Sequence, residues 1–183
     1  KIVLDVVDEC HKAKVKNLVV VSAGFKEVGD EGKALEQQLL AKITKYGMNM
    51  VGPNCLGVIN TNKDVCLDAS FAPELPTMGK LAFASQSGAL ASGIINLLPM
   101  LHLGVGQVIS LGNQTDVSVI DAMEYWEIDK NINQILLYLE SIPNPAKFRE
   151  VATRVSKTKP ILCIKAGRSS MGAKASASHT GSL

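Results

Sequence analysis

The apolar positions of the chain alternate between helical spacing and short strand-like runs. Apolar residues recur every three or four positions over residues 1–13 and 31–46, which predicts two amphipathic helices. Residues 18–21 form a continuous apolar run and 48–51 a similar run with a single polar position, and each leads into a loop that contains glycine. Runs of this kind are typical of buried parallel strands. The order of helices and strands predicts an α/β unit.

Residues 61–79 interrupt this pattern with prolines, a glycine and polar residues, and the alternation then restarts. We expect a domain boundary here, with residues 1–76 in one domain and 77–183 in a second. The second region alternates strands with helices, and Pro145 suits the first turn of its last helix. The strands are expected at 81–84, 105–111, 135–139 and 160–165, and the helices at 87–98, 118–126 and 145–156.

The chain begins and ends inside sequence patterns, not at breaks between predicted elements. The sequence lacks an initiator methionine and starts inside a predicted helix, and it stops two residues after a glycine. We therefore expect the chain to be part of a longer protein, with the beginning of the first domain missing.

Composition narrows the function classes. Apolar residues make up 46% of the chain and charged residues 20%, as in ordinary globular proteins. Aromatic residues are scarce at 4% and the net charge is only +2, which argues against nucleic-acid or membrane-surface partners. The four cysteines and three histidines show no metal-ligand spacing, so we predict no metal site and a cytoplasmic protein with reduced thiols. No apolar run approaches the roughly 20 residues of a membrane span.

A first candidate site is the segment 85–90, Ser-Gln-Ser-Gly-Ala-Leu, which follows a predicted strand and opens a predicted helix. A helix N-terminus offers unpaired N–H groups and a partial positive charge, which suit a phosphate. The alternative is that Ser87 simply caps the helix. In parallel α/β sheets, ligands bind beyond the carboxyl ends of the strands, where this segment lies.

Three further candidates lie at strand ends or in the tail. Gly112 and Asn113 follow a strand and suit either a ligand-binding loop or an ordinary turn. Glu140 follows the strand 135–139, where it is either a solvated loop charge or a carboxylate that orients a histidine. His179 stands among small residues in the tail 167–182, either as a carrier of a phosphoryl group or as a solvated side chain.

Two loops in the first unit complete the set. Val21, Ser22 and Ala23 lie at the end of one strand, and Asn54 and Cys55 follow the other. Both loops lie where an extended cofactor could cross the edge of the sheet, although neither is a phosphate fingerprint. A nucleophilic role for Cys55 needs a partner base that we cannot place, so this interpretation is disfavoured.

The succession of these segments is more specific than any one of them. The chain carries Gly52-Pro53-Asn54-Cys55, Gly79-Lys80 leading to 85–90, Ser110-Leu111-Gly112-Asn113, Glu140, Lys165-Ala166-Gly167-Arg168-Ser169 and Ser178-His179-Thr180-Gly181. It resembles, over essentially its whole length, the α part of NDP-forming acyl-CoA synthetases, specifically the ADP-forming acetate–CoA ligases. It is more distantly similar to the α subunit of succinyl-CoA synthetase.

The resemblance implies a fold and a reaction. The fold is α/β, with a truncated CoA-binding Rossmann-like domain followed by a flavodoxin-like parallel-sheet ligase domain. The reaction converts acyl-CoA, ADP and phosphate to carboxylate, CoA and ATP through an acyl phosphate and a phosphohistidine. The implied catalytic residues are His179 and Glu140. The implied phosphate-binding residues are Ser87, Gly88, Ala89, Gly112 and Asn113, and the implied coenzyme A contacts are Val21, Ser22, Ala23 and Asn54.

The resemblance also implies partners that this chain lacks. ADP or ATP with Mg²⁺ would bind mainly to an ATP-grasp domain or a β subunit, and the protein would be an oligomer that acts on acetate or another small carboxylate. Three alternatives stay open: a succinate–CoA ligase α subunit, a non-catalytic CoA-sensing part of a protein lysine acyltransferase, and a module that only binds CoA or a nucleotide. The acyltransferase regions generally lack the histidine, so His179 argues against the second.

Overall fold

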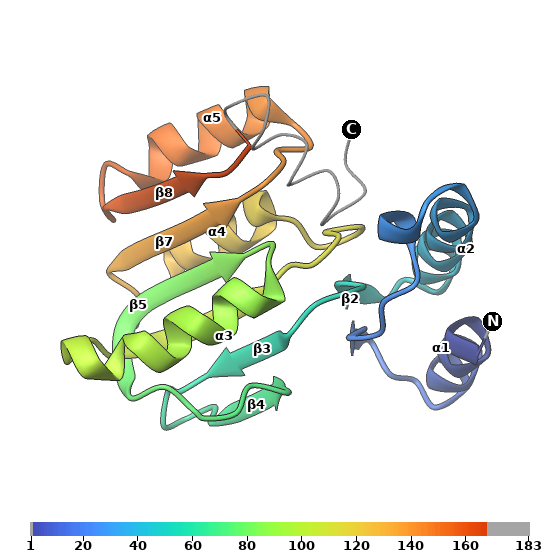
Figure 1. The fold of residues 1–183 in the computed structure, drawn as a ribbon, viewed down its shortest axis with the longest axis horizontal. Coiled ribbons are helices and arrows are strands. Elements are labelled where there is room, and N and C mark those ends of the chain that lie inside the picture. The colour runs from blue at the N-terminus through green and yellow to red at the C-terminus, as the bar shows by residue number, and fades with distance from the viewer. Residues whose placement is uncertain (1, 168–183) are drawn as a thin grey trace.

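The computed structural model describes residues 2–167, which form two sheets with helices packed on them (Figure 1). The elements, in chain order, are α1 (Ile2–Lys12), β1 (Asn17–Val19), the 3-10 helix η1 (Lys26–Val28), α2 (Asp30–Tyr46), β2 (Asn49–Val51), β3 (Gly57–Asn60), β4 (Leu67–Ser70), β5 (Met78–Ser85), α3 (Gly88–Leu97), the 3-10 helix η2 (Pro99–Leu101), β6 (Val105–Ser110), α4 (Val119–Ile128), β7 (Gln134–Leu139), α5 (Pro145–Val155) and β8 (Ile161–Lys165).

The first unit is a pair of parallel strands, β1 and β2, with α1 and α2 beside them. Its core is apolar and buries side chains from both helices and from the strand segments, among them Val7, Leu39, Ile43 and Met50. Helix α2 is capped at its C-terminus by Gly47, which adopts the left-handed conformation that glycine accepts without a steric penalty. The helices and strands predicted for this part of the sequence are confirmed.

The second unit is a six-stranded sheet in the order β4-β3-β6-β5-β7-β8. Strands β6, β5, β7 and β8 are parallel, as predicted. Alternate residues of β5 face opposite sides: Phe83 packs in the cluster with α3, whereas Ala82 and Ala84 pack in the cluster with α4 and α5. Figure 1 shows α3 on one face of the sheet and α4 and α5 on the other. The predicted α/β class is confirmed.

Caps visible in the sequence fix where two helices begin. Ser118 and Asp121 form a reciprocal capping box at the start of α4. Asn144 accepts a hydrogen bond from the Lys147 amide at the start of α5, and Pro145 occupies the first turn. Each cap satisfies amide groups that the helix itself leaves without partners.

The hairpin of β3 and β4 was not predicted. Its strands are antiparallel to each other, and β3 is also antiparallel to β6. Each strand has only four residues and β4 is a largely exposed edge strand with Asp68 and Ser70, so the apolar alternation is too short to be recognised. The hairpin lies within residues 1–76 but pairs with the second sheet, and the boundary predicted at 76/77 stays a prediction.

Residues 112–117, which we call the 112–117 loop, run from β6 towards α4 and hold the two sheets together through hydrogen bonds. Its backbone amides at Asn113, Thr115 and Val117 donate to the carbonyl groups of Pro53, Gly52 and Met50, at 2.9, 3.2 and 3.1 Å. The amide of Met50 in turn donates to Asp116 Oδ2 at 2.7 Å. The loop after β6 therefore lies along β2 and fixes the first unit against the second.

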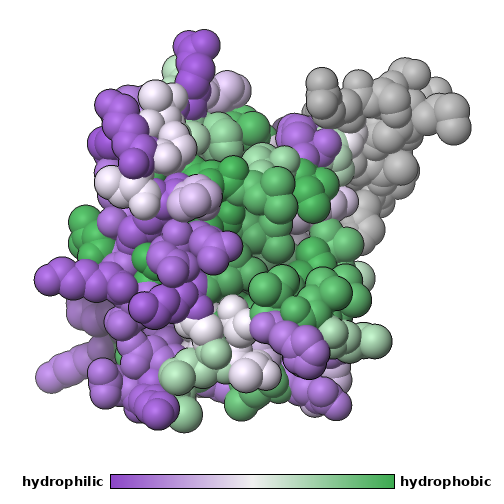
Figure 2. Space-filling view, turned by 90° about the vertical axis from the view of Figure 1, so that its left-hand side faces the viewer, coloured by the Kyte–Doolittle hydropathy of each residue, from purple (hydrophilic) through white to green (hydrophobic). Residues whose placement is uncertain are grey.

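One face of the six-stranded sheet is only partly covered. On β8, Leu162 and Ile164 pair with Leu136 and Tyr138 of β7, on the side that carries α3, and both β8 side chains are exposed. Figure 2 shows a broad apolar area beside polar surface.

Among the helices that the structure describes, none is long and apolar enough to cross a membrane.

Candidate functional site

The carboxyl ends of three parallel strands bring most of the predicted site segments to one edge of the sheet. Ser85, the last residue of β5, is in register with Ser110 of β6 and Tyr138 of β7. The segments that follow these strands, 86–88, 111–113 and 140–141, are therefore neighbours. The amide of Leu111 donates to the Ser85 carbonyl at 2.7 Å, which ties the first two segments together directly.

The start of α3 is shaped by two serines. Ser87 has an extended backbone, and its hydroxyl accepts a hydrogen bond from the Leu90 amide at 3.3 Å. The buried Ser85 hydroxyl donates to the Ser87 carbonyl at 2.8 Å and accepts from the Ser87 amide at 3.2 Å. Ser87 thus caps the helix, as the alternative interpretation predicted, while the phosphate role stays a prediction.

The cap leaves the first turn of α3 available to an anion. The amides of Gly88 and Ala89 belong to the turn in which a helix provides no backbone acceptor of its own. No acidic side chain lies in this turn. The partial positive charge of the helix N-terminus therefore faces outward without a competing carboxylate on the same turn.

A cavity of about 500 Å³ joins this helix end to the first unit. Two of its residues, Val21 and Asn54, come from the loops predicted to contact coenzyme A, and two others, Gly88 and Ala89, from the predicted phosphate site. The remaining lining residues are Cys55, Leu56, Phe71, Gln86 and Ser92. The structure thus brings together residues that the sequence places in separate groups. Ser22 and Ala23 are exposed in the loop that continues from Val21.

Cys55 forms part of this cavity but is poorly suited to attack a substrate. The side chain is buried, and its sulfur lies 3.4 Å from the Val20 carbonyl oxygen. Burial raises the pKa of the Cys55 thiol to about 11. The thiol is therefore protonated at neutral pH, which agrees with the disfavoured nucleophile interpretation.

Glu140 lies beside the start of α3 because Gln86 holds the chain there. Gln86 is almost fully buried, and its Oε1 accepts hydrogen bonds from the amides of Glu140 and Ser141, at 2.7 and 2.8 Å. Its Nε2 donates to the Ser141 carbonyl at 2.7 Å. Sequence reasoning missed this role of Gln86, although it belongs to the recognised 85–90 segment. His179, the predicted phosphohistidine, lies outside the described residues.

Gly112 and Asn113 lie at the start of the 112–117 loop, against the first unit. Gly112 has φ +54°, and a Cβ atom there would lie 2.3 Å from the Pro53 carbonyl oxygen. Asn113 is only 2% exposed and borders a separate hollow of about 250 Å³. Neither residue lines the 500 Å³ cavity. Their phosphate role stays a prediction, and the structure shows them packed against the first unit.

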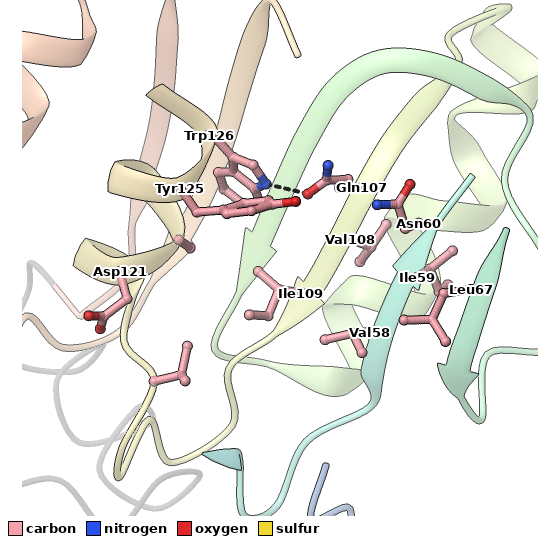
Figure 3. A pocket seen from close by; sticks show the side chains of 12 residues that line it. Val58, Ile59, Asn60, Leu67, Gln107, Val108, Ile109, Asp121, Tyr125 and Trp126 are labelled. Carbon is pink, nitrogen blue, oxygen red and sulfur yellow. Dashed lines mark hydrogen bonds between the residues drawn. The ribbon is translucent and has the colours of Figure 1, made fainter. Parts of the chain in front are cut away.

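A further cavity of about 330 Å³ lies between the sheet and α4 (Figure 3). Its walls are mainly apolar, with Val58 from β3, Ile109 from β6 and Trp126 from α4. The Trp126 indole donates to Gln107 Oε1 at 2.8 Å, as drawn in Figure 3. None of the predicted site residues contributes to this cavity, so it is not the candidate site.

The fold and the site define an α/β protein whose second sheet presents a helix N-terminus and a carboxylate at the ends of parallel strands. Residues 78–183 match the family described as the succinyl-CoA ligase like flavodoxin domain. This match covers more than half of the chain, and the chain belongs to that family.

Comparison with individual proteins extends the likeness to the whole chain. It is 45% identical to the acetate–CoA ligase (ADP-forming) I subunit alpha of Pyrococcus furiosus, covering 100% of this chain and 39% of that protein. It is 43% identical to the acetate–CoA ligase (ADP-forming) I of Archaeoglobus fulgidus, covering 100% of this chain and 26% of that protein. The resemblance inferred from the motifs is thereby confirmed.

A solved structure shows the same fold. The dinucleotide forming acetyl-coenzyme A synthetase 1 of Ca. Korarchaeum cryptofilum, in complex with phosphate and ADP, matches with a TM-score of 0.91 and 42% identity. The match covers 99% of this chain and 39% of that one. The chain thus spans well under half the length of the proteins it matches.

Proposed function

We propose that this chain is the CoA- and phosphate-handling part of an ADP-forming acyl-CoA synthetase. The observation that carries the proposal is the 500 Å³ cavity, which is lined by Val21 and Asn54 from the first unit and by Gly88 and Ala89 from the first turn of α3. A thioester held by the first unit would there present its carbonyl to a phosphate held by the helix. The names of the full-length relatives support the same activity.

The proposed reaction has three successive steps. A phosphate oxygen attacks the thioester carbonyl, the C–S bond breaks, and CoA leaves as the thiol with a proton from the phosphate. An imidazole nitrogen of His179 then attacks the phosphorus of the acyl phosphate, and the carboxylate leaves as the P–O bond breaks. Finally an oxygen of ADP attacks the phosphohistidine, the P–N bond breaks, and ATP forms.

In this scheme the first turn of α3 stabilises the negative charge of the phosphoryl oxygens. Backbone amides fixed in a helix need no reorganisation as charge develops, which is why such groups lower the barrier of phosphoryl transfer. Glu140 would hold the ring proton of His179 and stabilise the charged imidazole. Gln86 supports this step by fixing the backbone at Glu140.

The nucleotide site belongs to another part of the protein in this proposal. ADP or ATP with Mg²⁺ would bind to an ATP-grasp domain or a second subunit, and the phosphoryl group on His179 would pass between the two sites. Acetate is the proposed acid, as the names of the relatives suggest. A cytoplasmic location and an oligomeric state, expected from the sequence, are part of the proposal.

The deciding experiment uses the full-length protein with its nucleotide-binding part. It is incubated with γ-labelled ATP and Mg²⁺, and label that is acid-labile and alkali-stable is measured. Wild type should take up label and lose it on addition of acetate and CoA, and His179→Ala should take up none. His102→Asn is the matched control, since His102 is an exposed histidine with a positive φ that asparagine tolerates.

The opposite outcome also has a clear meaning. A folded wild-type protein that binds CoA but takes up no label would overturn the synthetase proposal and favour a CoA-sensing or binding module. Label that succinate discharges with CoA, and acetate does not, would move the assignment to a succinate–CoA ligase.

A further inference from the structure

Asn113 joins two carboxylates of the first unit through a single side-chain amide. Its Nδ2 atom donates to Glu27 Oε2 at 2.8 Å and to Glu36 Oε2 at 2.7 Å. An amide nitrogen carries two protons, so both are engaged. The side chain is almost fully buried, and Glu36 is only 7% exposed. A buried amide in this position is a donor that the two carboxylates share.

The other polar groups of Asn113 are also engaged by the first unit. Its backbone amide donates to the Pro53 carbonyl at 2.9 Å, and its backbone carbonyl accepts from Lys26 Nζ at 2.6 Å. Its Oδ1 lies 3.4 Å from Asn54 Nδ2, which donates to it. We call this set of contacts the Asn113 junction, made by Lys26, Glu27, Glu36, Asn54 and Asn113.

The Asn113 junction is hydrogen-bonded to two segments that line the 500 Å³ cavity or adjoin it. Glu27 Oε1 accepts from the amides of Gly24 and Phe25, at 2.5 and 3.0 Å, and so fixes the loop that begins with Val21. Asn54, on the other wall, bonds to Asn113 itself. Asn113 follows β6 and Leu111, whose amide is bonded to Ser85 next to the start of α3. Asn113 thus connects the two predicted coenzyme A loops, the one with Val21 and the one with Asn54, to the phosphate end of the cavity.

Asn113 lies between two carboxylates and one ammonium group. Burial would raise the pKa of Glu27, but the hydrogen bonds from Asn113 and from backbone amides outweigh it and hold the pKa below its ordinary value. Glu27 is therefore ionised at neutral pH. Lys26 supplies the positive charge on this side, with its Nζ 3.5 Å from Glu36 Oε1. Loss of the Asn113 amide would leave two carboxylates facing each other with fewer donors.

We propose that Asn113 is a positioning residue that sets the two coenzyme A loops relative to the N-terminus of α3, rather than a ligand of the phosphate. This inference rests on the proposed synthetase function. The positioning role affects only one of two steps of the reaction. Transfer of phosphate from ATP to His179 needs the N-terminus of α3 but no CoA, whereas the thioester step needs the two loops to be correctly placed relative to that N-terminus.

The test uses the full-length protein with its nucleotide-binding part, and compares wild type with Asn113→Ala. The KM for CoA in the overall reaction should rise about tenfold or more, the loss expected for a buried hydrogen bond to charged groups. The rate of His179 labelling from γ-labelled ATP without CoA should stay within about twofold of wild type, since the amides at Gly88 and Ala89 remain in place. Asn131→Ala, at an exposed asparagine, is the matched control and should change neither quantity.

A second variant keeps the test decisive if Asn113→Ala fails to fold, which thermal melting would reveal. Glu27→Ala removes a half-buried partner in the same junction, and it should raise the KM for CoA in the same direction by a smaller factor. An unchanged KM for CoA in a folded variant would overturn the positioning role. A labelling rate that falls together with CoA use would instead make Asn113 a phosphate ligand. Absence of label in wild type would be a failure of the synthetase proposal, not of this one.

Discussion

The side-chain oxygen of Gln86 binds the backbone amide of Glu140 at 2.7 Å, so the start of one helix fixes the end of the neighbouring strand. The same side chain also binds both backbone groups of Ser141. Gln86 and Glu140 are far apart in sequence, and their contact is what places a carboxylate beside the helix N-terminus.

Gln86→Ala should impair phosphorylation of His179 without abolishing CoA binding. The substitution removes three hydrogen bonds from a buried site, each worth about 1 kcal/mol, so the free energy of unfolding should fall by about 2–3 kcal/mol. Labelling from γ-labelled ATP should slow by about tenfold or more, because Glu140 is no longer held. Urea unfolding and labelling rates check the two effects. A labelling rate equal to wild type in the folded variant would contradict the role given to Gln86.

Ser87→Asp separates helix capping from phosphate binding. Aspartate caps helices as well as serine does, so the start of α3 should be retained, while burial of its charge at a side chain only 6% exposed should lower the free energy of unfolding. Its negative charge would occupy the proposed phosphate position, and labelling of His179 should fall by about a hundredfold or more. Asn144→Asp, at the N-cap of α5, is the matched control and should leave labelling unchanged. If Ser87→Asp retained normal labelling, the phosphate would have to bind elsewhere.

Gly112→Ala should destabilise the protein through a clash between the two units. A Cβ atom at this position would lie 2.3 Å from the Pro53 oxygen and 2.4 Å from the Asn54 oxygen, and the positive φ adds strain. Gly47→Ala provides the comparison, because Gly47 also has a positive φ but nothing lies within 4 Å of the added atom. Strain alone costs about 1–2 kcal/mol, so the loss at Gly112 should be clearly larger. Equal losses in urea unfolding would show that the loop yields freely.

Cys55 should react slowly with iodoacetamide at neutral pH. Burial raises its pKa to about 11, so the reactive thiolate is scarce below that pH and its population grows as the pH approaches 11. Cys66 is exposed and should be modified first. Mass spectrometry of peptides labelled at several pH values gives both rates. Rapid modification of Cys55 at pH 7 would require an activated thiolate and reopen the nucleophile interpretation.

The sequence was sufficient to predict the parallel strands and their helices. Each core strand is a short apolar run, and each helix is long enough to show its spacing, so local patterns such as 135–139 and 145–156 were read correctly. The hairpin at β3 and β4 was missed because its pairing with β6 is a long-range contact that four-residue strands do not encode locally. The strand-end rule also brought Glu140 and the 85–90 segment to the same edge.

The part of the site that escaped prediction depends on side-chain partners distant in sequence. Asn113 was given a phosphate role through the family resemblance, since Gly-Asn after a strand is common to turns and ligand loops alike. What the pattern could not show was that Glu27 and Glu36, from η1 and α2, converge on its amide. Both carboxylates look like ordinary surface charges in the sequence.

The bonding of the 112–117 loop along β2 bears on how the protein unfolds. Separating the two sheets would break three backbone hydrogen bonds and, with them, the contacts of Asn113. If one unit opened alone, the other would lose these hydrogen bonds and the packing that goes with them. Cooperativity should therefore extend across the contact between the two sheets, and heat or urea should melt both sheets in a single transition.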